Sequence, residues 1–92
     1  MKILAVCGMG LGSSMILKIQ IEKAARALGL DTQIELADIT TARSLAVNAD
    51  IIVTSKELAE RIGAVKGKII TITNYMDLNE MTTKLKGAIS ET

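Results

Sequence analysis

The sequence predicts an α/β fold in which a four-stranded parallel sheet, in the strand order 2-1-3-4, has helices on both faces. The first observation behind this prediction is that four short apolar runs, rich in β-branched residues, have the length of strands. The second is that the four segments following these runs have apolar residues at helical spacing. Repeated strand–helix alternation is typical of parallel strands joined by right-handed crossovers, and 2-1-3-4 is the simplest order for it.

The expected strands are residues 3–6, 32–36, 51–53 and 69–72. The first helix is expected to start at Ser13, a favourable N-cap residue, and to end before Gly29, which suits a left-handed C-cap. One face of this helix is apolar, and it consists of Leu17, Ile21, Ala24, Ala25 and Leu28. We therefore expect this face to pack on the sheet.

The other three helices have weaker signals. A helix from about residue 40 to residue 47 would turn Ala42, Leu45 and Ala46 inward. Ser55 is expected to cap a third helix, which ends before Gly63. Residues 77–80 resemble a capping box at the start of a fourth helix. The apolar residues of this fourth helix are Leu78, Met81, Leu85, Ala88 and Ile89.

Length and composition limit the possible functions. The 92 residues predict a single domain over residues 1–92, and a hydrophobic content of 49% supplies its core. A net charge of +1 argues against binding to a nucleic-acid backbone, and one Tyr without Phe or Trp argues against base stacking. Because there is no His and only one Cys, we expect neither a metal site nor an intramolecular disulfide. The apolar runs are too short for a membrane span or a signal peptide, so we expect a cytoplasmic protein.

The segment Cys7-Gly8-Met9-Gly10-Leu11-Gly12-Ser13-Ser14 follows the first expected strand. In a flavodoxin-like sheet of order 2-1-3-4, ligands bind beyond the carboxyl ends of the strands, where the strand order reverses beside strand 1. Alternate glycines let several N–H groups point at one anion, and the following helix adds the positive end of its dipole. The same dipoles favour the thiolate of Cys7, a nucleophile that needs no separate base. The segment therefore predicts a phosphate cradle with Cys7 at its edge.

Each of these features also has a purely structural interpretation. A lone Cys at a strand end is often a small core residue, glycines after a strand often form only a tight turn, and Ser13 then only caps a helix. Gly8, Gly10 and Gly12 match neither the nucleotide-binding loop that ends in Gly-Lys-Ser/Thr nor the GxGxxG motif. We favour a reactive Cys7 because the Cys, the glycines, the cap and the switch point coincide within eight residues.

Residues 3–16, with the sequence ILAVCGMGLGSSMI, resemble the start of enzyme IIB components of the bacterial sugar phosphotransferase system (PTS). Among the lactose-, ascorbate- and galactitol-like IIB proteins, the ascorbate-type branch, with its Cys-Gly-x-Gly-x-Gly-Ser-Ser loop, is the most similar. The resemblance implies that Cys7 takes a phosphoryl group from a phosphohistidine of the IIA component and passes it to a sugar bound by the membrane transporter IIC.

The resemblance has further implications. It implies a phosphotransferase without a cofactor, which reaches the membrane only through IIC and acts on ascorbate or a related small polyol. It also implies a phosphate cradle formed by the backbone of Gly8, Met9, Gly10, Leu11, Gly12, Ser13 and Ser14.

Two other functions stay open from the residues alone. Low-molecular-weight tyrosine phosphatases share this type of sheet and a cysteine phosphate loop, but they have an Arg six residues after the Cys, where this chain has Ser13. Without this Arg we expect poor phosphatase activity. A small nucleotide- or flavin-binding module is the second alternative, and the scarcity of aromatic side chains counts against it.

Residues outside the cradle receive smaller roles. Asp77 lies where the phosphatases have their acid, but we interpret it as the N-cap of the fourth helix. Asn74 and Tyr75 follow the fourth strand, at the same edge of the sheet as Cys7, and could support the loop. An apolar rim, through which a monomer would dock to IIA and IIC in turn, is expected at Met9, Leu11, Met15 and Ile16. Solvated faces are expected at Lys56, Lys66, Lys68, Lys84 and Lys86.

Overall fold

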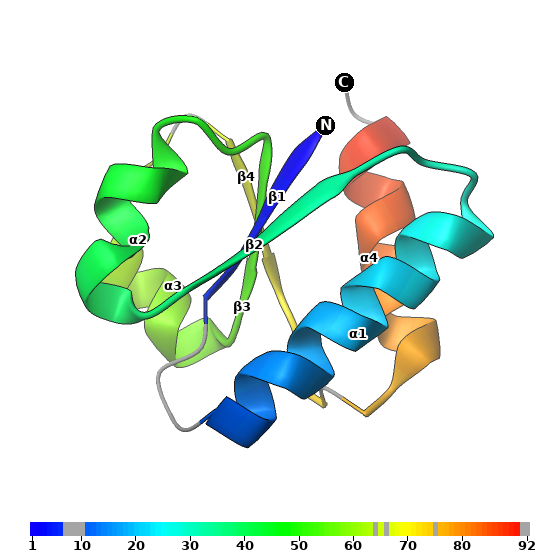
Figure 1. The fold of residues 1–92 in the computed structure, drawn as a ribbon, viewed down its shortest axis with the longest axis horizontal. Coiled ribbons are helices and arrows are strands. Elements are labelled where there is room, and N and C mark those ends of the chain that lie inside the picture. The colour runs from blue at the N-terminus through cyan, green and yellow to red at the C-terminus, as the bar shows by residue number, and fades with distance from the viewer. Residues whose placement is uncertain (7–10, 64, 66, 75, 91–92) are drawn as a thin grey trace.

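Four parallel strands form one sheet in the order β2-β1-β3-β4 in the computed structural model (Figure 1). The structure describes residues 1–6, 11–63, 65, 67–74 and 76–90, without the side chains of residues 11–14 and 90. The strands are β1 (Lys2–Val6), β2 (Gln33–Ala37), β3 (Ile51–Thr54) and β4 (Lys68–Thr71). The helices are α1 (Leu11–Ala27), α2 (Ile39–Ala46), α3 (Lys56–Ile62) and α4 (Leu78–Ser90). The predicted fold class and strand order are therefore confirmed.

The two central strands are the most deeply buried part of the sheet. In β1 the four residues after Lys2 are buried, and all four residues of β3 are buried. The edge strands β2 and β4 are partly exposed. Parallel strands that are covered on both faces read as continuous apolar runs rather than as alternating ones, which explains the signals of β1 and β3 in the sequence.

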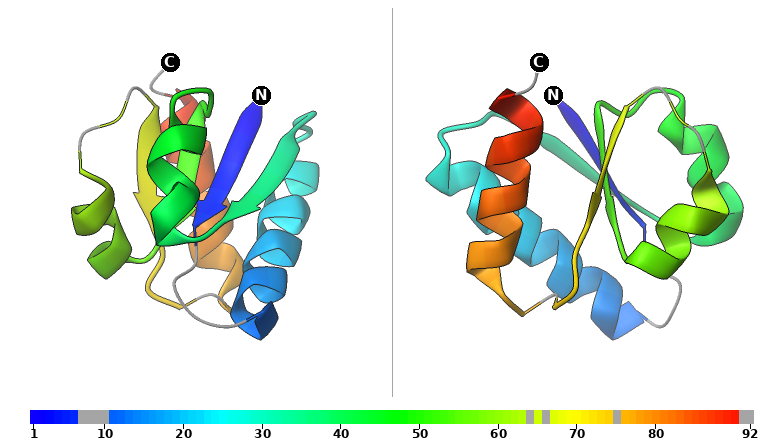
Figure 2. Two further views of the ribbon diagram at one scale, coloured as in Figure 1. Left: turned by 60° about the vertical axis from the view of Figure 1, so that its left-hand side comes forward. Right: turned by 180° about the vertical axis from the view of Figure 1, so that it is seen from behind.

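Two helical layers cover the sheet: α1 and α4 lie on one face, and α2 and α3 lie on the other (Figure 2). Side chains of β1 alternate between these layers, so Ile3 and Ala5 join the core under α1 and α4, whereas Leu4 and Val6 join the core under α2 and α3. The predicted apolar face of the first helix is confirmed, since all of it is buried except the half-buried Leu28.

The predicted caps are largely confirmed. Gly29 has a φ of +71°, and its N–H bonds to the carbonyl of Arg26 while the N–H of Leu30 bonds to that of Ala25, at 3.1 and 2.9 Å. This is a Schellman motif, in which only glycine is unstrained at the left-handed position. Ser55 caps α3 by accepting from the N–H of Leu58 at 3.3 Å. The second helix has an N-cap that the sequence analysis did not assign, namely Asp38.

Two of the lysines expected on solvated faces make contacts instead, so that prediction was wrong for them. The ammonium group of Lys68 donates to the carbonyl of Ala88 at 3.0 Å, and that of Lys84 bonds to the carbonyl of Thr71 and pairs with Glu80. Both side chains reach from one element to another across β4 and α4. Long aliphatic stems allow lysine to cover apolar surface in this way while its charge remains hydrogen-bonded.

Candidate functional site at the carboxyl edge of the sheet

All four strands end at the same edge of the sheet, which is here called the carboxyl edge. Their last residues are Val6, Ala37, Thr54 and Thr71. The chain passes from β1 through α1 to β2 on one side, and from β2 through α2 to β3 on the other, so the strand order reverses beside β1. This is the predicted switch point. The predicted residues Cys7, Gly8, Met9 and Gly10 follow β1 in the chain but lie outside the described residues.

The helix that follows this segment starts two residues earlier than predicted. Because α1 begins at Leu11, Ser13 lies in its first turn and is not its N-cap. Serine is a favourable N-cap residue, but its presence alone does not fix where a helix starts. Glycine, which precedes Leu11 in the sequence, is also a favourable N-cap. The predicted cradle residues Gly12, Ser13 and Ser14 now lie in the first turn of α1. The N–H groups of Gly12 and Ser13 precede the first intrahelical bond and have no acceptor within the helix, whereas the N–H of Ser14, the fourth residue, is placed to make that bond.

The start of α1 is electrostatically suited to an anion. Its first turn contains no acidic residue, whereas α3 and α4 have Glu57 and Glu80 in theirs. A carboxylate in the first turn offsets the positive end of the helix dipole, so its absence leaves that end available to an external anion. The backbone of α1 therefore meets one requirement of the predicted phosphate cradle.

A buried hydroxyl joins the ends of β1 and β3 at this edge. The Oγ1 atom of Thr54 donates to the carbonyl oxygen of Val6 at 2.9 Å, and the side chain of Thr54 is fully buried. Backbone pairing of the two strands extends to Ala5 and Val53, so this side-chain bond forms one residue beyond it. The sequence analysis missed Thr54, because a Thr within an apolar strand carries no signal of its own.

The segment between β4 and α4 is fixed to the helix by Glu80. Its carboxylate oxygens accept from the N–H groups of Asn74 and Thr73, each at 3.0 Å, and Oε2 lies 3.0 Å from the ammonium group of Lys84. The bond from Asn74, followed by those from Thr73 and Lys84, lowers the pKa of Glu80 from 4.5 to about 2. The carbonyl of Thr71, at the end of β4, accepts from the same Lys84. One carboxylate thus connects the strand end, the following loop and α4.

The three predicted residues in that loop have different outcomes. Asp77 accepts from the N–H of Glu80 at 3.1 Å, so its interpretation as the cap of α4 is confirmed. The side chain of Asn74 accepts from the N–H of Met76 at 3.0 Å, which shapes the loop itself. Its role toward Cys7 stays a prediction, and Tyr75 lies outside the described residues.

Part of the predicted apolar rim is exposed on α1. Met15 and Ile16 have 52% and 39% of their surface exposed, while the side chains of Met9 and Leu11 lie outside the described part of the chain. Ile19, which the sequence analysis did not assign, is 43% exposed. It lies one helical turn after Met15 and Ile16, and this spacing could have identified it. We refer to Met15, Ile16 and Ile19 as the α1 patch.

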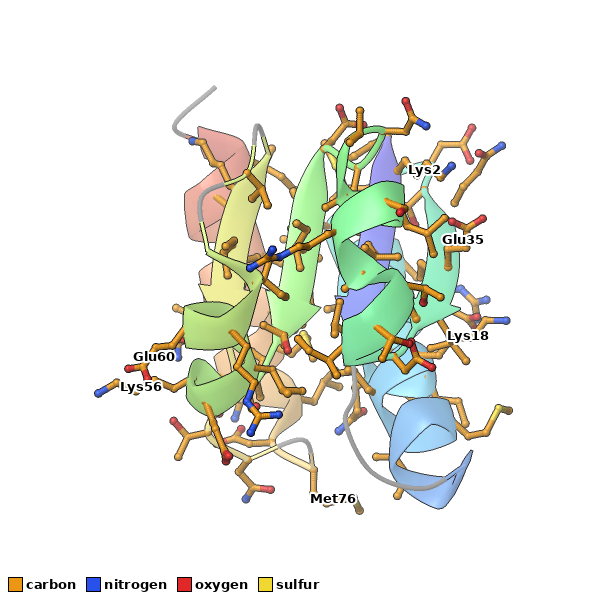
Figure 3. The ribbon with its side chains drawn as sticks, turned by 90° about the vertical axis from the view of Figure 1, so that its left-hand side faces the viewer. Lys2, Lys18, Glu35, Lys56, Glu60 and Met76 are labelled. Atoms are coloured by element: carbon orange, nitrogen blue, oxygen red, sulfur yellow. The ribbon has the colours of Figure 1, made fainter. Side chains whose placement is uncertain are left out.

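Charged and apolar side chains surround the carboxyl edge. Figure 3 shows Lys56 on α3 and Met76 near α4 at the end of the molecule to which the strands point, opposite Lys2. Asp38 also lies at this end, where hydrogen bonds from Thr40 and Thr41 lower its pKa to about 2. Among the described residues, no group of His, Cys, Asp and Glu side chains could hold a metal ion. None of the described helices has the length and hydropathy that a membrane crossing requires.

Comparisons with known proteins identify relatives of the whole chain. The family model "PTS system, Lactose/Cellobiose specific IIB subunit" matches residues 2–86. An ascorbate-specific PTS system EIIB component from Mycoplasma pneumoniae is 36% identical over 80 residues, which are 86% of this chain and 84% of the relative. The component of the same name from Salmonella choleraesuis is 31% identical over 91 residues, which are 98% of this chain and 90% of the relative.

Solved structures with the same fold are also IIB components. The cellobiose-specific phosphotransferase IIB component from Borrelia burgdorferi has a TM-score of 0.60 at 27% identity, with 98% of this chain and 89% of that chain covered. The lactose-specific IIB component domain from Streptococcus pneumoniae has a TM-score of 0.60 at 19% identity, with 98% and 95% covered. This second likeness concerns the fold alone.

Proposed function

The chain belongs to the lactose/cellobiose-specific IIB family of the phosphotransferase system, and on this premise we propose that Cys7 carries the phosphoryl group. IIB components are sugar phosphotransferases that work with IIA and IIC partners in general. For this chain, the donor is a phosphohistidine of a IIA component, and the acceptor is a sugar bound by a IIC transporter. The backbone N–H groups of residues 8–14 hold the phosphoryl group.

The proposed reaction has two displacements at phosphorus. In the first, the thiolate of Cys7 attacks the phosphohistidine; the S–P bond forms, the N–P bond breaks, and the imidazole leaves with that electron pair. In the second, a sugar hydroxyl attacks the phosphocysteine; the O–P bond forms, the S–P bond breaks, and the thiolate is regenerated. Because this chain contains no His, we assign the base that takes the hydroxyl proton to the partner.

The start of α1 is the observation that carries the proposal. In the sequence, only Gly8, Met9 and Gly10 separate Cys7 from the first residue of α1. The first turn of α1 has no carboxylate to offset the helix dipole. Such a helix start stabilises both a thiolate and a phosphoryl dianion relative to their protonated forms. An anionic nucleophile and an anionic intermediate are the two species that a phosphocysteine carrier must stabilise.

A carrier fits this site better than a hydrolase does. A phosphatase of the low-molecular-weight type needs an Arg six residues after its Cys, and Ser13 is found there. An Arg that contacts the transferring phosphoryl group contributes orders of magnitude to the rate in phosphoryl-transfer enzymes. Neutral N–H groups hold phosphate less tightly than a bidentate guanidinium, which suits an intermediate that must be handed on.

Hydrolysis of an aryl phosphate such as p-nitrophenyl phosphate distinguishes the two functions. We expect negligible turnover by the wild-type chain, no greater than that of Cys7→Ser, because the Arg is missing. A low-molecular-weight tyrosine phosphatase assayed in parallel serves as the positive control. Steady Cys7-dependent hydrolysis at the rate of that control would contradict the carrier function.

The relatives also support a choice of sugar. Curated proteins that are 31–36% identical to this chain are named ascorbate-specific, so we propose ascorbate or a related small polyol as the sugar. We further propose that the chain acts as a single-domain monomer that docks transiently, through Met9, Leu11, Met15 and Ile16, first to IIA and then to IIC.

A further inference from the structure

Thr54 is a polar residue in an otherwise apolar strand. The other residues of β3 are Ile51, Ile52 and Val53, and all four side chains are buried. A buried hydroxyl costs free energy unless it is hydrogen-bonded, and a Val of nearly the same shape would fill the same space without that cost. The bond from the hydroxyl of Thr54 to the carbonyl of Val6, at 2.9 Å, compensates this cost and gives a reason for a Thr at this position.

The carbonyl that Thr54 holds belongs to the peptide unit between Val6 and Cys7. A peptide unit is planar, so the direction of the Val6 carbonyl also sets the direction in which the chain continues to the next residue. Among the described residues, backbone pairing between β1 and β3 extends to Ala5 and Val53. In the described part of the chain, Val6 is the register partner of Ala37 in β2, and the hydroxyl of Thr54 adds a bond from β3 to the same last residue of β1.

We infer that Thr54 is a positioning residue, whose hydroxyl orients the Val6–Cys7 peptide and thereby aligns the Cys7 thiolate with the start of α1 and with its phosphoryl donor. This inference rests on the proposed function, because it gives Cys7 the reacting sulfur. The hydroxyl takes no part in the bond changes at phosphorus. A misplacement of about 1 Å at a reacting group is enough to slow a reaction by roughly a hundredfold.

Two readouts separate positioning from a merely structural role. The first is the pH dependence of alkylation by iodoacetamide, which reports the apparent pKa of Cys7 directly because it is the only cysteine in the chain. The second is the rate at which the chain takes up a phosphoryl group from the phosphorylated IIA component of an ascorbate-specific system. A structural role alone would lower the melting temperature and leave both readouts unchanged.

The decisive variants are Thr54→Val, which removes only the hydroxyl, and Thr54→Ser, which retains it. For Thr54→Val we expect uptake at least about tenfold slower and a thiol pKa shifted toward the ordinary value of about 8.5. Thr54→Ser should restore most of both properties. Thr71→Val is the matched control, since Thr71 is the partner of Thr54 in the β3–β4 register and makes no side-chain bond to Val6.

A Thr54→Val chain with the wild-type thiol pKa and uptake rate would overturn the inference, whatever its melting temperature. If that variant melts below the assay temperature, Thr54→Ala against Thr54→Ser makes the same comparison with smaller side chains. A wild-type chain that accepts no phosphoryl group would contradict the proposed function. The alkylation profiles, which need no partner, would then still decide the role of Thr54.

Discussion

Glu80 shows how a single carboxylate can organise a loop beside the candidate site. Its two oxygens hold the N–H groups of Thr73 and Asn74, and Lys84 compensates its charge. Each of these groups binds the ionised form better than the protonated form, which is why the pKa of Glu80 falls to about 2. The contacts of Glu80 with the loop are therefore strongest while Glu80 is ionised.

This linkage predicts a pH-dependent effect of Glu80→Gln. A carboxylate whose pKa is lowered from 4.5 to about 2 contributes stability that is fully present above the higher value and is lost as the pH falls through the lower one. The melting temperature of Glu80→Gln should therefore lie below that of the wild type near neutral pH, and the difference should shrink across this window. Circular dichroism melts at a series of pH values measure it.

The matched control for this prediction is Glu60→Gln, on the exposed face of α3 (Figure 3). Removal of an exposed carboxylate from a helix surface should change the melting temperature little. A Glu80→Gln difference that stayed constant down to the lowest pH would show that Glu80 acts through packing rather than through its charge.

Residue-level signals in the sequence predicted only part of this arrangement. The cap at Asp77 was predictable because it joins residues three positions apart. In a complete capping box, Glu80 would bond to the N–H of Asp77, but that N–H bonds to the carbonyl of Asn74 and Glu80 bonds to the loop instead. The loop is placed by the contact of α4 with β4, and such a tertiary contact leaves no periodic signal.

At the scale of elements, the exposed side chains of the α1 patch form a candidate docking surface. We expect Met15→Asp and Ile16→Asp to leave the melting temperature nearly unchanged, because both side chains are already exposed. Phosphoryl uptake from the phosphorylated IIA component should slow by at least about tenfold, since a charge in an apolar interface costs more than about 1.4 kcal/mol. Stopped reactions at several times measure the rate.

A second exposed apolar residue provides the control for this prediction. Val47, at the end of α2, is 66% exposed and lies at the edge of the sheet opposite to the carboxyl edge. Val47→Asp introduces the same charge and should leave the uptake rate unchanged. Wild-type rates in both Met15→Asp and Ile16→Asp would exclude the α1 patch as the docking surface, and Met9→Asp and Leu11→Asp would then test the rest of the predicted rim.

Element boundaries followed from the sequence wherever the signal was local. All four strands were predicted to within one residue at each end, because short runs rich in β-branched apolar residues are a local signal. The start of α1 was wrong by two residues, since two different residue types near it favour an N-cap. The need for a glycine at position 67 was not predictable from the sequence. A Cβ atom there would lie 2.6 Å from the carbonyl oxygen of Ala49, a close approach that only the tertiary structure shows.

At the scale of the whole molecule, the two apolar layers and the polar carboxyl edge have separate tasks. One apolar layer lies between the sheet and the pair α1 and α4, and the other lies between the sheet and the pair α2 and α3. Both layers stabilise the sheet, and the alternation of strands and helices in the sequence was sufficient to predict them. The carboxyl edge carries the contacts of Thr54, Glu80 and Asp38, which join elements or cap helices. The fold thus ends β1, the strand that precedes Cys7 in the sequence, at the switch point.

Intact-protein mass spectrometry after incubation with a phosphorylated IIA component tests the central claim most directly. The proposed function predicts that the wild-type chain gains the mass of one phosphoryl group, and that Cys7→Ser and Cys7→Ala gain none. Each variant should retain the circular dichroism spectrum of the wild type, so that a loss of labelling reports the sulfur and not the fold. An acid-stable phosphoryl group on Cys7→Ala would contradict the account, because it would place the acceptor on a Ser or Thr.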